Sequence, residues 1–334
     1  MSQQVLAKDK GVEEPAKNDG ISKRVSDFMV SYGIIIAFLF ICAVLSVISP
    51  YFLSTNNLLN VLRQVSINGV LAIGMTFVIL TRGIDLSVGS LMACSSIVAA
   101  SFAAGSEASF ILVPIMMGLV TGLTLGAVNG LLIARFAIPP FVMTLGMLSM
   151  ARGLTYIYND GMPISNLDAT FRFIGQGVVL GMPVPVLLFL GVFLISWFTL
   201  RYTTFGRYVY AVGGNPQAAM VSGINVRRVT FTVYAISGLL CGLAGLMIAA
   251  RTGAALPQAG VAYELDAIAA VVIGGTSLAG GRGRIVGTLF GVLIIGVLNN
   301  GLDLLGVSSF YQQVVKGGII VLAVMLDRSR LSSS

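Results

Sequence analysis

The feature that most constrains this chain is a series of long stretches that contain no charged residue. They cover residues 28–62, 64–81, 86–106, 108–134, 173–200, 229–250 and 285–302. A helix needs roughly 20 apolar residues to cross the hydrocarbon core of a bilayer, so most of these stretches are long enough to do so. Only 10% of the 334 residues are charged, against about 25% in an ordinary soluble domain. We therefore expect an all-α protein that crosses a membrane many times.

Ten transmembrane helices are expected from the positions of the apolar stretches and of the turn residues between them. They are placed near residues 28–48, 60–80, 86–104, 109–134, 139–157, 183–200, 229–250, 264–277, 285–303 and 311–326. Together they predict a single transmembrane domain over residues 28–326. A disordered cytoplasmic tail is expected over residues 1–27, and a short cytoplasmic tail over residues 327–334.

The eighth expected helix is the shortest. Glu264 and Asp266 open it and Gly274-Gly275 close it after too few residues for a full crossing. We expect it to be short, broken or re-entrant, which a membrane protein tolerates only where the protein itself covers the backbone.

The distribution of basic residues predicts the orientation of the chain. With the amino terminus inside and ten crossings, all but five of the 20 Lys and Arg residues face the cytoplasm, as membrane proteins prefer. The five exceptions are Arg63, Arg152, Arg172, Arg251 and Lys316. Both termini are therefore expected in the cytoplasm. The net charge of +7 follows from this topology and does not indicate a nucleic-acid partner.

Catalytic chemistry is not expected in this chain. It has no histidine, and Cys42, Cys94 and Cys241 all lie in apolar stretches, which argues against a Cys/His metal site, a disulfide framework or a histidine base. The glycine-rich run over residues 274–284 lacks the Gly-Lys-Ser/Thr of a phosphate-binding loop. We expect no cofactor here; any ATP and magnesium must be bound by another subunit.

Residues 201–228 form the one long cytoplasmic connection that we expect between helices. Asn215 suits an N-cap, Pro216 the first helical position and Gly223 a left-handed stop, so a helix of two turns is predicted between them. The residues of this helix that we expect to be exposed, Ala218, Ala219, Met220 and Val221, are small or apolar where a free loop would be polar. We expect another protein to cover them; the alternative is a helix that lies on lipid headgroups.

A second cluster marks the turn between the second and third expected helices. Gly83 permits a tight reversal, and Asp85 can cap the third helix or pair with Arg82. Ser87 and Gly89 complete this turn or gate. A cap, a substrate contact and a gate or partner contact all remain open as roles for Asp85.

Neutral polar residues inside the expected helices are candidates for a substrate path. They are Asn68, Thr76, Asn129, Thr144, Asn299 and Asn300. Amides and hydroxyls match a polyhydroxylated solute without the desolvation cost of a charge, although each can also bond a neighbouring helix. Glycines that recur every four residues, Gly118, Gly122, Gly126 and Gly130, predict a close helix contact.

Four segments give the chain a resemblance to a known family. They are residues 83–90, 139–146, 206–226 and, most specific, 263–281, which runs from Tyr263-Glu264-Leu265-Asp266 to Ala279-Gly280-Gly281. Through them the chain resembles the ribose-type permeases of bacterial ATP-binding-cassette sugar importers, over about residues 32–326.

The resemblance implies a ten-helix fold of the vitamin B12 permease type, whose two halves, helices two to five and seven to ten, form an inverted repeat. It also implies two permease subunits (a homodimer), a cytoplasmic ATPase and a periplasmic sugar-binding protein. Six residues of the cytoplasmic loop would contact the ATPase: Asn215, Pro216, Ala218, Ala219, Gly223 and Ile224. The substrate would be ribose or a related pentose, hexose or polyol.

The alternative function is an ion-coupled secondary transporter of a polar solute. Such a protein needs an ionisable group inside its helix bundle. The acidic candidates, Asp303, Glu264 and Asp266, are expected at helix ends near the outer surface, which disfavours this class.

Overall fold

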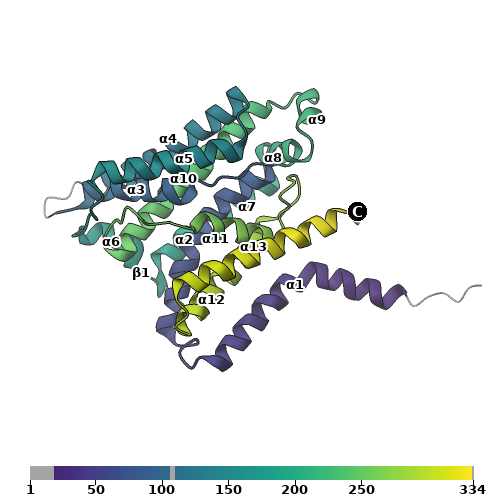
Figure 1. Cartoon of the computed structure of the whole chain (residues 1–334), viewed down its shortest axis with the longest axis horizontal. Helices are drawn as coiled ribbons and strands as arrows, with labels where there is room; N and C mark the ends of the chain where they lie inside the picture. The colour runs from purple at the N-terminus through teal and green to yellow at the C-terminus, as the bar shows by residue number, and fades with distance from the viewer. Residues whose placement is uncertain (1–18, 106–109, 333–334) are drawn as a thin grey trace, which may run out of the picture.

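A computed structural model describes residues 19–105 and 110–332 of the chain. These residues form helices and one small hairpin (Figure 1). The helices are α1 (Asp19–Ile48), α2 (Thr55–Leu80), α3 (Val88–Ala103), α4 (Leu112–Phe136), α5 (Pro140–Tyr158), α6 (Ala169–Gln176), α7 (Val184–Tyr202), α8 (Thr204–Gly214), α9 (Pro216–Val221), α10 (Val226–Thr252), α11 (Tyr263–Ile273), α12 (Ile285–Leu304) and α13 (Ser309–Ser332).

Each of the ten expected spans coincides with a helix. Five of these helices, α2, α4, α7, α10 and α12, are long and apolar enough to cross a membrane, and α3 and residues 33–48 of α1 are shorter apolar helices. The expected all-α class and multi-pass membrane character are therefore confirmed.

The two expected tails differ from the structure where it describes them. Residues 1–18 of the first tail lie outside the described part of the chain, but α1 begins at Asp19, before the expected boundary at Phe28. No proline interrupts the chain between Asp19 and Ile48, so nothing in the sequence forces a later start. At the other end, α13 continues through the expected boundary at 327 as far as Ser332.

Helix α2 forms the centre of the bundle. Every residue from Val65 to Leu80 is buried, and the helix packs against α7, α10, α11 and α12. Helix α10 adds contacts to α3 and α4. The core of the molecule therefore lies around two long helices, α2 and α10.

Glycines bring α4 and α10 into direct backbone contact, as their spacing predicted. A Cβ atom added at Gly122 would lie 2.3 Å from the carbonyl oxygen of Gly238, and one at Gly126 would lie 2.5 Å from that of Tyr234. Backbone atoms cannot move aside as a side chain can, so this contact requires glycine.

Among the ten helices that coincide with expected spans, α11 and α3 are too short to cross a bilayer. Helix α11 has 11 residues, about 16 Å at 1.5 Å per residue, so the expected short element is confirmed. It ends at Ile273 and not at 277, because Gly275 adopts a left-handed conformation (φ +83°). Helix α3 is also short, with 16 residues, about 24 Å; the sequence did not predict this.

The amino-terminal ends of α3 and α11 meet inside the bundle. A Cβ atom at Gly89, in the first turn of α3, would lie 2.1 Å from the carbonyl oxygen of Gly260, which shortly precedes α11. The segments that lead into both helices, residues 81–87 and 253–262, are not helical. Each half of the chain thus contains a short helix that starts within the protein.

A small substructure over residues 164–183 was not predicted. Helix α6 is capped by Asp168, whose side chain accepts a hydrogen bond from the Thr170 backbone (2.7 Å). Strands β1 (Val178–Val179) and β2 (Met182–Pro183) are joined by Leu180 and Gly181, both with positive φ, as a tight hairpin requires.

Candidate functional sites

Helix α9, in the connection over residues 201–228, forms as its sequence predicted. The Asn215 side chain accepts hydrogen bonds from the backbones of Gln217 and Ala218, each at 3.0 Å. Pro216 occupies the first helical position. Gly223 closes the helix in a left-handed conformation (φ +84°), and the Ile224 backbone donates to the Ala219 carbonyl (3.0 Å). The cap, the start and the stop are all confirmed.

The two faces of α9 differ. Val221 is 90% exposed and Met220 64% exposed, and Ala218 is exposed as well. Ala219 is buried at 3% and belongs to the core, so the expectation that it would be exposed is wrong. The reason is that a short helix seated on the bundle must direct one face inward. Ile224, which is partly buried, packs against the same core.

The turn after α2 is built differently from the prediction. Arg82, and not Gly83, takes the left-handed position (φ +65°). Its side chain donates from Nε to the Gly213 carbonyl (2.6 Å) and from Nη2 to the Gly214 carbonyl. These carbonyls belong to the last residues of α8. Of the two alternatives for Asp85, pairing with Arg82 is therefore not observed. Gly83 instead makes room for the Tyr234 hydroxyl, to which an added Cβ would lie at 2.4 Å.

Asp85 is fully buried. Its Oδ1 accepts from the Ser87 hydroxyl (2.6 Å) and backbone (3.0 Å), and its Oδ2 accepts from the Ser237 hydroxyl (3.1 Å). Asn129 Nδ2 in turn donates to Ser87 Oγ (3.0 Å). Ser87 is the residue that precedes α3, so Asp85 fixes the start of that helix through Ser87.

This polar cluster lies within the bundle. Ser237 is 11 residues after Val226, the start of α10, or about 16 Å along that helix. Three hydrogen bonds from Ser87 and Ser237 satisfy both side-chain oxygens of Asp85 there. Of the expected turn or gate residues, Asp85 and Ser87 form this cluster, whereas Gly83 and Gly89 serve close backbone contacts.

The remaining path candidates mostly bond neighbouring segments. The Thr76 and Thr288 hydroxyls lie 2.9 Å apart and join α2 to α12. Thr144 donates to the Pro140 carbonyl (2.9 Å) and lies 3.2 Å from that of Ile84. Asn68 is buried, and its Oδ1 has no hydrogen-bond partner among the described residues.

The two adjacent asparagines of α12 are both buried and both paired. Asn300 exchanges two hydrogen bonds with Asn57, at 2.8 Å and 3.0 Å. Asn299 Nδ2 donates to Asp266 Oδ2 (3.3 Å). The six path candidates therefore lie at separate helix contacts and do not converge on one site.

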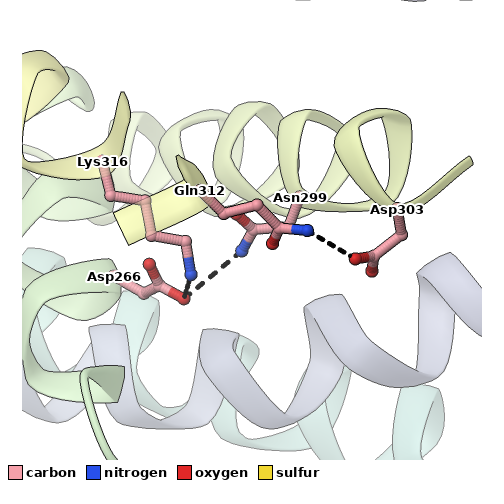
Figure 2. A network of polar contacts seen from close by, with 5 residues as sticks. All are labelled: Asp266, Asn299, Asp303, Gln312 and Lys316. Carbon is pink, nitrogen blue, oxygen red and sulfur yellow. Dashed lines mark hydrogen bonds and ion pairs between the residues drawn. The ribbon is translucent and has the colours of Figure 1, made fainter. Parts of the chain in front are cut away.

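A network of charged and amide side chains connects α11, α12 and α13 (Figure 2). Lys316 Nζ lies 3.0 Å from Asp266 Oδ2, and the Gln312 side chain donates to Asp303 Oδ1 (2.8 Å). Asp266 stands in the first turn of α11, as expected for a helix end, but it is only 3% exposed. Its side chain therefore lies within the bundle, between α11, α12 and α13.

Arg152 makes a second contact that the sequence analysis missed. From α5, its Nη1 donates to the carbonyls of Pro257 (2.6 Å) and Ala259 (2.8 Å), and so fastens the segment that leads into α11. Arg152 and Lys316 are two of the five basic residues that do not face the predicted cytoplasmic side. A lone basic residue in an apolar helix was the signal that could have identified both.

Comparison with known proteins gives a consistent result. The chain matches, over residues 57–324, the family described as "Branched-chain amino acid transport system / permease component". It is 51% identical over 315 residues to the ribose import permease protein RbsC of Bacillus subtilis, which covers 93% of this chain and 95% of that protein. RbsC of Escherichia coli K12 is 50% identical over 301 residues (89% and 93%). The D-allose transport system permease protein AlsC of the same strain is 40% identical over 322 residues (95% and 98%). No solved structure matches the chain.

Proposed function

The chain belongs to this permease family, and from that premise we propose that it is the membrane-spanning permease subunit of an ATP-driven importer for a monosaccharide. The observation that carries the proposal is a sequence comparison. About half of the aligned residues, over about nine-tenths of the chain, are identical to those of proteins named as ribose import permeases. The chain is a transport subunit and not an enzyme.

Ribose is the proposed substrate. The family description names branched-chain amino acids, whereas relatives that are 46–51% identical to this chain are named for ribose. Identity is lower, at 40%, 39% and 37%, with permeases named for D-allose, L-arabinose and galactose.

The ATPase partner docks on α9. Exposed apolar side chains at Met220 and Val221 support this contact, since water would otherwise surround them. Asn215, Pro216 and Gly223 give this helix its shape, Ala219 and Ile224 seat it on the bundle, and Ala218 lies on the outer side. ATP and magnesium are bound by the partner.

The arrangement in the bacterial inner membrane is ten helices with both termini in the cytoplasm. Helices α2–α5 and α10–α13 form the inverted repeat. The inverted repeat is supported by the order of helices in each half: the short helix α3 follows the long helix α2, and the short helix α11 follows the long helix α10.

A second copy of the chain and a periplasmic sugar-binding protein complete the importer. Within one copy, most of the polar path candidates already form hydrogen bonds to neighbouring segments of the chain. We therefore propose that the sugar passes between the two copies. The path would be lined by neutral polar groups and small residues and would bind the sugar weakly.

Uptake of radiolabelled ribose tests the proposal. In cells that carry this chain naturally, its deletion should abolish high-affinity ribose uptake, and the intact gene should restore it. Unlabelled allose, arabinose, galactose and leucine are the competitors. A deletion strain that loses leucine uptake but keeps ribose uptake would contradict the proposal.

A further inference from the structure

We propose that Arg82 is a positioning residue that transmits the movement of α8 and α9 to the central helix α2. The inference rests on the proposed function, because it requires the ATPase to move α9. The inference concerns how that movement reaches the membrane domain. It does not concern the docking contact itself or the identity of the sugar.

The first observation is the backbone at Arg82. After α2 ends, the Arg82 backbone donates to the Ile79 carbonyl (2.9 Å) and the Gly83 backbone donates to that of Val78 (2.9 Å). The left-handed residue in such a helix stop is usually glycine. Here it is arginine, with φ +65°, although glycine follows at the next position. A strained backbone that keeps a long side chain indicates that the side chain has a use.

The second observation is the pair of groups that the side chain contacts. Nε donates to the Gly213 carbonyl and Nη2 to the Gly214 carbonyl, the last two residues of α8. Carbonyls at a helix end lack partners within the helix, and a cation there also favours the helix dipole. Only Asn215 separates this point from α9.

The third observation is the close backbone contact around this link. The Gly281 backbone donates to the Leu80 carbonyl (3.0 Å), and a Cβ at Gly213 would lie 1.7 Å from the same oxygen. The Tyr210 hydroxyl of α8 donates to the Gly283 carbonyl (3.0 Å). The ends of α2 and α8 and the α11–α12 turn therefore meet at one junction.

Packing and hydrogen bonding transmit movement differently. Backbones in van der Waals contact resist being pushed together but separate freely. The two hydrogen bonds of Arg82 also resist separation, so α8 can pull on α2 as well as push it. Because α2 is buried from Val65 to Leu80 and packs against α7, α10, α11 and α12, its displacement reaches most of the bundle.

The test is Arg82→Gly in the complete importer reconstituted in liposomes. Glycine suits the left-handed backbone, so the change removes the link without harming the turn. The matched control is Ala137→Gly, because Ala137 is also left-handed (φ +52°) at the end of α4 and has no such side chain. Arg82→Lys keeps the charge but cannot span both carbonyls.

Four quantities are measured: thermal stability, recovery of the ATPase with the permease, the rate of ATP hydrolysis, and the number of ribose molecules transported per ATP. For Arg82→Gly we expect unchanged stability, recovery and hydrolysis, with at least tenfold less ribose per ATP. Arg82→Lys should be intermediate, and Ala137→Gly should match the wild type.

If Arg82→Gly transports as much ribose per ATP as the wild type, the inference is overturned. It is also overturned if that variant no longer recovers the ATPase, because Arg82 would then contribute to docking. If instead the wild-type chain recovers no ATPase or transports no ribose, the proposed function itself fails.

Discussion

At the scale of single residues, two lone basic side chains in apolar helices connect parts of the bundle. Arg152 holds the backbone of the segment before α11, and Lys316 pairs with Asp266 of α11 itself. Both contacts therefore stabilise the short helix that starts inside the protein.

The buried pair gives the first prediction. Lys316→Met should lower the free energy of unfolding by about 3 kcal/mol or more, because it leaves the Asp266 carboxylate buried without a counter-ion. Adding Asp266→Asn should restore most of the loss. Thermal unfolding in detergent measures both variants.

Arg207→Met, at an exposed position of α8, is the control and should change stability by no more than about 0.5 kcal/mol. Equal losses in the single and double variants would show that the pair itself does not matter.

At the scale of elements, α9 illustrates a helix whose ends are fixed by local sequence. Gly223 has φ +84°, and its backbone donates to the Met220 carbonyl (3.0 Å). Gly223→Pro should abolish transport while leaving membrane insertion intact, because proline fixes φ near −65° and has no N–H. Radiolabelled ribose uptake and the amount of protein in the membrane are the two measurements.

Gly223→Asn is the matched control, since asparagine tolerates the left-handed conformation, and it should retain transport. If the asparagine variant fails as completely as the proline variant, the conformation of the stop is not what matters.

The α4–α10 contact gives a second prediction for elements. Gly122→Ala should destabilise the protein by about 1–3 kcal/mol, since its Cβ would lie 2.3 Å from a backbone oxygen. Gly146→Ala in α5 has nothing within 4 Å of the added atom, so it should be neutral or stabilise by about 0.5–1 kcal/mol. Thermal unfolding compares them, and a neutral Gly122→Ala would contradict the close contact.

At the scale of the whole molecule, the orientation can be tested with two exposed loop positions. In a chain whose three cysteines are replaced by alanine, Ser222→Cys should react with a membrane-impermeant maleimide only from the cytoplasm. Met162→Cys, which is 64% exposed beyond α5, should react only from the periplasm. The reversed pattern would refute the topology.

The sequence predicted the features that depend on local chemistry. The cap at Asn215, the stop at Gly223 and the glycine contact of α4 all follow from residue types at fixed spacing. It did not predict features that depend on distant partners. The burial of Ala219, the Asp266–Lys316 pair and the contact of Arg82 with α8 depend on which helices become neighbours. Helix α3 resembled a full span because the charge-free stretch over residues 86–106 is longer than the helix that forms within it. Polar residues within helices can line a path or form inter-helix hydrogen bonds, and the sequence alone does not distinguish the two.

The glycine contact between α4 and α10 also determines how these helices can move. At Gly122, Gly126 and Gly238 the touching surfaces are backbone alone, so there are no side-chain rotamers to change and no flexible atoms to absorb a shift. Sliding one helix along the other would drive the next Cα into a carbonyl group. We expect α4 and α10 to travel as one rigid body through every state of the protein, and hinges to lie elsewhere.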